Sequence, residues 1–159
     1  MSAVLSIADL VVRFGGGAAA AVDGVSLELR RGEFFGLVGE SGCGKSTLAN
    51  AVMGLLPPFA NVSGGVRVNG REVVGLSDAE LRSMRGVEAA MIFQDASASL
   101  DPTWSVGDQI AEALRAHRLG ARAAKARALA LMTEVGIADP RGATTIRHIA
   151  CRAECASAS

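Results

Sequence analysis

The sequence of 159 residues has few aromatic side chains and no net charge. Aromatic residues make up 4% of the chain, and its 16 basic side chains are balanced by 16 acidic ones. A protein without net charge has no global electrostatic field, which excludes general attraction to nucleic acid or to an acidic membrane. No run of eighteen apolar residues occurs, so the sequence predicts no transmembrane helix. The N-terminus lacks a basic segment followed by an apolar stretch and a cleavage site, so we expect no secretion.

Cysteine and histidine are too few to indicate a metal site. Cys43 lies in a glycine-rich stretch, while Cys151 and Cys155 stand near the C-terminus. Two thiols spaced C-x-x-x-C supply only two ligands, so we expect neither a metal nor a redox role for them. The odd number of cysteines favours free thiols in a reducing cytoplasm. His117 and His148 are the two histidines, and we expect both to be solvated or partly packed.

Four segments carry the apolar pattern of β-strands. Apolar residues alternate with polar ones in residues 5–14 and 25–29, which predicts half-buried strands. Residues 33–38 and 89–93 are nearly continuous apolar runs. Such runs are typical of strands that are buried on both faces of a sheet.

Turn and capping signals predict a hairpin and four helices. Asn69-Gly70 is a strong two-residue turn signal between alternating apolar residues, and it predicts a hairpin over residues 66–74. Ser77 and Glu80 have the spacing of a capping box. Apolar residues at helical spacing, with glycine or proline after them, predict helices over residues 45–52, 77–84, 106–117 and 121–135. The mixture indicates an α/β domain with a small antiparallel annex and a helical extension.

The most specific motif is a phosphate-binding loop between the apolar run 33–38 and the helix 45–52. Its residues fit G-x-x-x-x-G-K-[ST] at every fixed position and continue into a threonine: Gly39, Glu40, Ser41, Gly42, Cys43, Gly44, Lys45, Ser46 and Thr47. Glycines let consecutive backbone N–H groups converge on phosphate oxygens, and the following helix directs its positive end at the same point.

The residue types in this loop also indicate the ligand. Lys45 can reach the β- and γ-phosphates of a nucleotide, and the Ser46 hydroxyl can bind Mg²⁺. The alternative is a glycine-rich turn with a chance Lys-Ser pair, which would need neither the strand before it nor the helix after it. The sequence therefore predicts a nucleoside triphosphate site, with ATP and Mg²⁺ as the favoured ligands.

Three stretches together resemble the ATP-binding subunits of ABC transporters. They are residues 22–27 (V-D-G-V-S-L), the phosphate loop, and residues 91–95 (M-I-F-Q-D). Residues 92–95, 99–102 (S-L-D-P) and 106–110 (V-G-D-Q-I) are similar to the branch that energises oligopeptide and dipeptide import. The resemblance spans about residues 4–140. It implies a P-loop NTPase core of the ABC ATPase type, with a small antiparallel β annex and the start of a helical subdomain.

The resemblance implies roles for two residues outside the loop. Gln94 would occupy the Q-loop, where it contacts Mg²⁺ and senses the membrane subunits, although by itself it would indicate only a polar residue that ends a strand. Phe14 falls where the family places an aromatic ring that stacks on adenine, but a core phenylalanine can also end a strand. For Glu40, Asp95 and Asp101 we expect turn or surface roles, because no partner base or metal cluster accompanies them.

The resemblance also implies partners and a location. ABC ATPase subunits work with transporter membrane subunits and with a second ATPase subunit. We therefore expect the chain to be cytoplasmic, peripheral on the cytoplasmic face of the cell membrane, and associated with the membrane through its partners only. No nucleic-acid partner is expected. The membrane and binding-protein subunits of such importers select the substrate, so the ATPase sequence does not identify it.

Motifs that this family uses for hydrolysis are missing from the sequence. They are the Leu-Ser-Gly-Gly signature, which contacts ATP across a dimer, an apolar strand that ends in Asp-Glu, and a late histidine switch. In the family the Asp assists Mg²⁺ and the Glu polarises the attacking water, so their loss removes a main component of phosphoryl transfer. We therefore expect no catalytic residue in this chain, and a core that lacks its C-terminal part.

The last residues offer an explanation for the missing signature. Codons for residues 150–159 can be chosen so that the same nucleotides, read from the third base, encode Leu-Ser-Gly-Gly-Met-Arg-Gln-Arg-Val. This is the family's signature in its peptide-importer form, and we therefore hypothesise a frameshift soon after Pro140. The predicted organisation is an incomplete nucleotide-binding core with its annex (1–100), part of the helical subdomain (101–140) and an out-of-frame tail (141–159). Two alternatives stay open: a nucleotide-binding module that does not hydrolyse ATP, and a truncated fragment without function.

Overall fold

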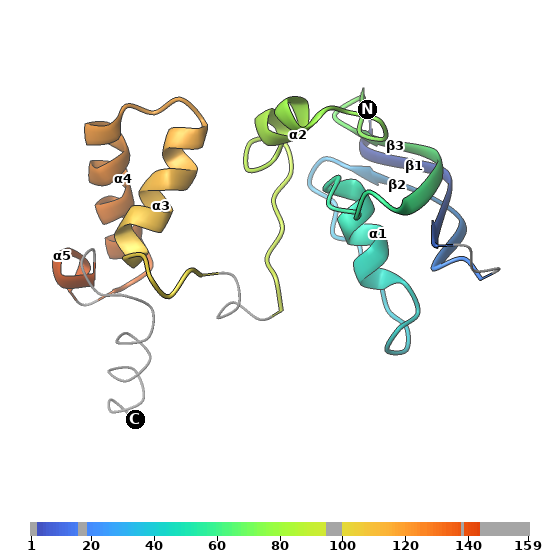
Figure 1. Cartoon of the computed structure of the whole chain (residues 1–159), viewed down its shortest axis with the longest axis horizontal. Coiled ribbons are helices and arrows are strands. Elements are labelled where there is room, and N and C mark those ends of the chain that lie inside the picture. Colours follow the sequence, from blue (N-terminus) through green and yellow to red (C-terminus); the bar gives the residue numbers. More distant parts are fainter. Residues whose placement is uncertain (1–2, 16–18, 95–99, 138, 144–159) are drawn as a thin grey trace. The chain divides into compact units, whose positions relative to one another are not determined.

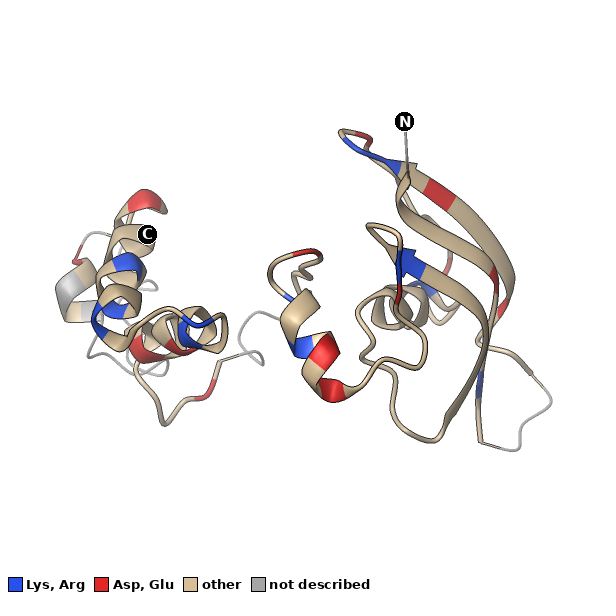
Figure 2. Ribbon diagram, turned by 90° about the horizontal axis from the view of Figure 1, so that it is seen from above, with Lys and Arg blue, Asp and Glu red and all other residues tan. Residues whose placement is uncertain are grey.

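The computed structural model describes residues 3–15, 19–94, 100–137 and 139–143. The chain divides into two compact units, Met1–Met91 and Ile92–Ser159, and each unit has its own apolar cluster. The first unit holds a small sheet with helices α1 and α2, and the second holds helices α3 to α5 (Figure 1). Charged residues of both signs occur on each unit (Figure 2). No helix in the described ranges has both the length and the apolar character needed to cross a bilayer.

Four antiparallel strands form the sheet of the first unit, in the order β2-β1-β3-β4. Their bounds are Ala3–Phe14 (β1), Val22–Arg30 (β2), Ala60–Val68 (β3) and Arg71–Glu72 (β4). Val12 of β1 lies opposite Val22 of β2 and Val62 of β3. Asn69 and Gly70 have φ values of 50° and 81°, as the two-residue turn between β3 and β4 requires. The first two predicted strands and the predicted hairpin are therefore confirmed.

The core of the first unit joins this sheet to two short helices, α1 (Lys45–Val52) and α2 (Asp78–Met84). Leu10, Val12 and Val66 have no exposed surface at all. Burial of one such side chain stabilises a protein by about 1.5–3 kcal/mol, so this cluster is the main contribution that holds α1 to the sheet. The other buried members of the cluster are Ile7, Val22, Leu48, Ala51, Val68, Val73, Leu81 and Met84.

Helix α2 begins with the predicted capping box. The Ser77 hydroxyl accepts a hydrogen bond from the Glu80 amide, and the Glu80 carboxylate accepts one from the Ser77 amide at 2.9 Å. Hydrogen bonds from Ser77, together with the charge of Arg71, hold the pKa of Glu80 below its ordinary value. The ionised carboxylate therefore stabilises α2 above the unfolded-state pKa of Glu80, and this contribution is lost as the pH falls through the folded-state pKa.

Arg85 caps the C-terminal end of α1 although it lies far away in the sequence. Its guanidinium group donates hydrogen bonds to the carbonyl oxygens of Met53 at 2.9 Å and Gly54 at 2.6 Å. The last carbonyl groups of a helix have no partner inside it, and a cation at this end also interacts favourably with the helix dipole. Arg85 thus fixes the segment that follows α2 against the end of α1.

We expect Arg85→Met to lower the free energy of unfolding by about 1–3 kcal/mol, because two part-buried carbonyl oxygens lose a charged donor. Urea unfolding followed by circular dichroism measures this difference. Arg82→Met is the matched control, since the Arg82 side chain is exposed on α2 and forms no hydrogen bond with any residue that the structure describes. Equal destabilisation by the two substitutions would contradict the capping role.

The second unit is built on α3 (Val106–Ala116) and α4 (Ala121–Glu134), followed by the single turn α5 (Pro140–Ala143). Ser105 caps α3, because its hydroxyl accepts a hydrogen bond from the amide of Asp108 at 3.1 Å. Buried alanines fill the contact between α3 and α4, namely Ala111, Ala124 and Ala128. The two predicted helices of this region are confirmed, with ends that differ by one residue.

The predicted buried strand over residues 33–38 is wrong. The backbone of residues 33–40 is irregular, and Phe34 and Val38 are 102% and 90% exposed. A strand exists only by pairing with a neighbour, and none of the described residues supplies a strand beside this segment. The apolar residues are present as predicted, but their neighbours in a sheet are not.

The predicted strand over residues 89–93 is wrong for the same reason. Only an isolated bridge between Arg85 and Ala89 occurs there, and residues 90–93 are irregular. Ile92 is 96% exposed. Both corrections agree with a core sheet of which this chain contains only part.

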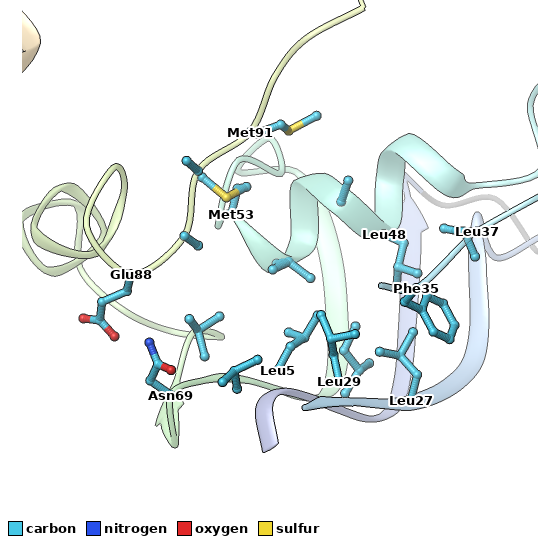
Figure 3. Close-up of a pocket in the computed structure, with 17 residues that line it drawn as sticks. Leu5, Leu27, Leu29, Phe35, Leu37, Leu48, Met53, Asn69, Glu88 and Met91 are labelled. Atoms are coloured by element: carbon cyan, nitrogen blue, oxygen red, sulfur yellow. The ribbon is translucent and has the colours of Figure 1, made fainter. Parts of the chain in front are cut away.

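An apolar pocket of about 420 Å³, partly open to solvent, lies on the first unit. Phe35 and Leu37 border it together with Leu48 of α1 and Leu27 of β2 (Figure 3). Phe35 and Leu37 are themselves 55% and 46% exposed, so the irregular segment 33–40 borders the core without covering it.

Candidate phosphate-binding site

The phosphate loop runs from Gly39 into the first turn of α1. Gly42 and Gly44 have φ values of 81° and 95°, in the left-handed region that glycine adopts without steric cost. Helix α1 begins at Lys45, as predicted, and its N-cap residue, Gly44, has no side chain that could cap it. The first amide N–H groups of the helix, including that of Ser46, therefore remain available to an anion.

Lys45 lies folded over this loop. Its ammonium group donates hydrogen bonds to the carbonyl oxygens of Gly39 at 2.8 Å and Glu40 at 2.6 Å, and it lies 3.4 Å from the sulfur of Cys43. None of these three groups is a carboxylate, and no carboxylate of the described residues forms an ion pair with Lys45. The loop therefore holds a cation at the place where phosphate oxygens converge in a motif of this type.

Gly44 brings the loop into contact with the residue before β2. A Cβ atom at Gly44 would clash with the carbonyl oxygen of Ala21 and would lie 3.7 Å from Cγ2 of Val22. No other residue fits at this position unless the loop moves. The amide of Ala21 in turn donates a hydrogen bond to the carbonyl oxygen of Val12 at 2.8 Å. These contacts fix the phosphate loop relative to the end of β1, which carries Phe14.

A hollow of about 330 Å³ lies beside the loop. Asp23, Cys43 and Lys45 contribute the polar side chains of its wall. The rest of the wall consists of Ala20, Ala21, Val22, Val25, Leu37, Val38, Gly44 and Leu48. A mainly apolar pocket with a few polar groups is the usual form of a small-molecule site.

Phe14 ends β1 with part of its ring open to solvent. Its ring centroid lies 6.3 Å from that of Phe59, and the two ring planes meet at 61°. Phe14 is 38% exposed and Phe59 is 65% exposed. Phe59 comes directly before β3, whose first residue, Ala60, lies opposite Phe14. Phe59 follows Pro57 and Pro58. No motif or apolar periodicity in the sequence marks it as a site residue.

Ser46 and Gln94 are the predicted Mg²⁺ ligands. Ser46 is exposed in the first turn of α1. Mg²⁺ commonly takes one or two protein ligands and completes its octahedron with phosphate oxygens and waters, so the Ser46 hydroxyl fits such a site. Among the described residues no three His, Cys, Asp or Glu side chains cluster as a metal site. Gln94 is exposed and belongs to the second unit, and its part in binding Mg²⁺ stays a prediction.

Glu40 and Asp101, two acidic residues near the motifs, are both exposed. Glu40 is exposed, and only its backbone carbonyl contacts Lys45. The Asp101 carboxylate accepts hydrogen bonds from the hydroxyl and the amide of Thr103 at 2.6 and 2.8 Å, which hold the pKa of Asp101 below its ordinary value. The side chain of Gln109 accepts a hydrogen bond from the Asp101 amide and donates one to the Asp101 carbonyl oxygen, each at 2.8 Å. These contacts confirm the turn role predicted for Asp101.

Several predictions concern residues outside the described ranges. Asp95, His148, Cys151 and Cys155 belong to this group, as does most of the tail 141–159. Cys43, by contrast, is an exposed free thiol, as predicted.

Known proteins resemble this sequence over most of its length. The ABC transporter family model matches residues 22–153. The dipeptide transport ATP-binding protein DppD of Bacillus subtilis is 46% identical over 145 residues, which are 88% of this chain and 43% of that protein. The oligopeptide transport ATP-binding protein OppD of Mycobacterium tuberculosis is 46% identical over 145 residues, which are 89% of this chain and 24% of that protein. The chain therefore spans less than half the length of these relatives.

A solved structure has the same fold. A dimeric ATP-binding cassette in a post-hydrolysis state, bound to ADP and phosphate, matches with a TM-score of 0.71 at 22% identity. The match covers 91% of this chain and 61% of that chain. The fold is thus the P-loop ATPase fold, of which this chain contains only part. Because the family model matches most of the sequence, the chain belongs to the ABC transporter family.

Proposed function

We propose that this chain is the N-terminal portion of an ATP-binding subunit of a peptide importer. The observation that carries the proposal is the phosphate loop, in which two neutral carbonyl oxygens hold the ammonium group of Lys45 at the start of α1. Relatives that are named for dipeptide and oligopeptide transport support peptides as the transported class.

Each predicted site residue has a place in this proposal. The triphosphate lies on the loop from Gly39 to Thr47, with Lys45 on the β- and γ-phosphates. Ser46 and Gln94 supply oxygen ligands to Mg²⁺, which neutralises phosphate charge. Phe14 stacks on the adenine through its exposed ring.

The partners in this proposal are transporter membrane subunits and a second ATPase subunit. Residues 101–140 contribute part of a helical subdomain, and residues 141–159 are an out-of-frame tail. The subunit works on the cytoplasmic face of the cell membrane, which it reaches through these partners. Neither nucleic acid nor direct membrane binding is part of its function.

A second candidate function is nucleotide binding without hydrolysis. The incomplete core favours it, since Phe34 and Val38 are almost fully exposed and no described strand pairs with their segment. The loop, by contrast, is formed within the first unit. In this candidate function the chain binds ATP at the same site but does not hydrolyse it.

Calorimetric titration of the purified 159-residue chain with ATP tests the proposal, after far-UV circular dichroism has shown that the protein is folded. We expect saturable binding with one site per chain, and weaker binding when a chelator removes Mg²⁺. Ser46→Ala should reduce the difference between the two conditions, because it removes the protein's hydroxyl ligand to the metal. Folded protein that gives no binding isotherm for ATP with Mg²⁺ would contradict the proposal.

Phe14→Ala is expected to weaken ATP binding by roughly tenfold, because stacking of a base on an aromatic ring is worth about 1–3 kcal/mol. Binding of inorganic triphosphate should stay nearly unchanged, since this ligand has no base. The two affinities are measured on the same preparation by calorimetry. If both ligands weaken equally, Phe14 only supports the fold and the stacking role is wrong.

A further inference from the structure

Phe14 and Phe59 form an aromatic pair at the end of β1, and both residues are more exposed than a contact in the core would be. Phe59 is 65% exposed, so burial in the core does not account for its position. Its ring nevertheless contacts Phe14 at a centroid distance of 6.3 Å, with an angle of 61° between the ring planes. Edge-to-face pairs of this type are stabilised beyond what the area that they bury contributes.

We infer that Phe59 is a positioning residue for the base of the nucleotide and acts by holding the ring of Phe14. The inference rests on the proposed function, because it concerns the same site. It adds a residue from a different segment to base recognition. It also predicts that selectivity for a base over bare phosphate depends on the pair of rings and not on Phe14 alone.

The backbone around Phe59 restricts where its ring can lie. The amide of Ala60 donates a hydrogen bond to the carbonyl oxygen of Pro57 at 2.9 Å, which closes a turn directly before β3. Proline fixes φ, so Pro57 and Pro58 limit the conformations of this turn. Ala60 pairs with Phe14 across the sheet, which places Phe59 beside the end of β1.

The geometry of the pair leaves ring surface for a ligand. With the planes at 61°, Phe59 covers at most one face of Phe14, and Phe14 remains 38% exposed. A planar base needs only one open π-face for offset stacking. Phe14 is the last residue of β1, and Gly15 after it has a φ of 62°. The contact with Phe59 thus restrains a ring at the point where the strand ends.

The aromatic pair and the phosphate loop belong to one connected region of the first unit. Gly44 of the loop contacts Ala21, and the amide of Ala21 is bonded to Val12, two residues before Phe14. A ligand that carries both a base and phosphates can therefore use the rings and the loop together. Inorganic triphosphate can use only the loop.

The experiment compares ATP with inorganic triphosphate on Phe59 variants of the 159-residue chain, by calorimetry. Phe59→Ala and Phe59→Leu are expected to weaken ATP binding by about three- to tenfold, as loss of an aromatic pair predicts. Neither variant should change the affinity for triphosphate. Phe59→Tyr keeps a ring in place and should restore ATP binding, whereas leucine keeps only bulk and apolar character.

A double-mutant cycle separates positioning from a structural role. In the Phe14→Ala background, Phe59→Ala should have no further effect on ATP affinity, because the ring that it positions is gone. Three results would each overturn the inference. They are equal weakening of ATP and triphosphate binding, an ATP affinity of Phe59→Leu equal to that of the unaltered chain, and an undiminished effect of Phe59→Ala in the Phe14→Ala background. If the unaltered chain binds neither ligand, the proposed function fails as well. If it binds both and Phe59 has no effect, only this inference fails.

Discussion

The 159-residue chain is expected to release phosphate from ATP no faster than its Lys45→Ala variant. Binding on the loop positions the nucleotide and neutralises charge, but acceleration needs interactions that are stronger in the transition state than in the ground state. In the ABC family these interactions depend on the Leu-Ser-Gly-Gly signature and on the Asp-Glu strand end, and neither occurs in this sequence. Without a water oriented at the γ-phosphate, a main part of the catalysis of phosphoryl transfer is lost.

A steady-state phosphate-release assay on the purified chain measures this rate. A rate well above that of Lys45→Ala, and comparable with ordinary ABC ATPases, would contradict both the prediction and the frameshift hypothesis. Resequencing the codons after Pro140 tests the hypothesis directly. A gene whose frame is repaired at that point should encode the signature and give a chain with restored hydrolysis, which provides the positive control.

Lys45→Ala should lower the affinity for ATP by at least about tenfold, because a charge-assisted hydrogen bond contributes about 1.5–3 kcal/mol. The ammonium group of Lys45 is held within the loop by two neutral carbonyl oxygens, so it can exchange these bonds for bonds to phosphate oxygens. Calorimetric titration of the folded variant with ATP measures the loss. Unchanged binding would show that the loop is not the site of the nucleotide.

Lys125→Ala is the matched control for this experiment. Lys125 is an exposed lysine whose ammonium group lies 3.8 Å from the Asp108 carboxylate in the second unit. Exposed pairs of this kind contribute about 0–1 kcal/mol to stability, so its loss should leave both the fold and ATP affinity unchanged. Lys45 also donates hydrogen bonds to the carbonyl oxygens of Gly39 and Glu40, so its loss could disturb the structure of the loop. Thermal unfolding of both variants distinguishes this effect from the loss of a phosphate contact.

Local signals were sufficient to predict the elements whose ends are fixed by nearby residues. Helix α1 runs from Lys45 to Val52 as predicted, because glycines at positions 44 and 54 lie just outside its two ends and both take positive φ. Asn69-Gly70 fixed the hairpin in the same way, and Ser77 with Glu80 fixed the start of α2. In each case the residues that decide the conformation lie within a few positions of one another.

Long-range partners account for what the sequence could not predict. Residues 33–38 have the composition of a buried strand, but strand structure depends on a neighbour that the described residues do not supply. Arg85 bonds the end of α1 across a long stretch of sequence, and no periodic pattern marks such a contact. Phe59 was missed because its significance comes from Phe14, which is distant in the sequence and adjacent in the sheet register.

The exposed apolar residues before the phosphate loop affect how fast this protein is degraded in the cell. Phe34, Phe35, Leu37 and Val38 all lie open to solvent within one short irregular stretch. Chaperones and proteases act on chains that expose apolar segments, so degradation sets the steady-state amount of such a protein. Binding of a partner chain over this stretch would therefore slow degradation and raise the protein's abundance, even without any effect on the binding or hydrolysis of ATP.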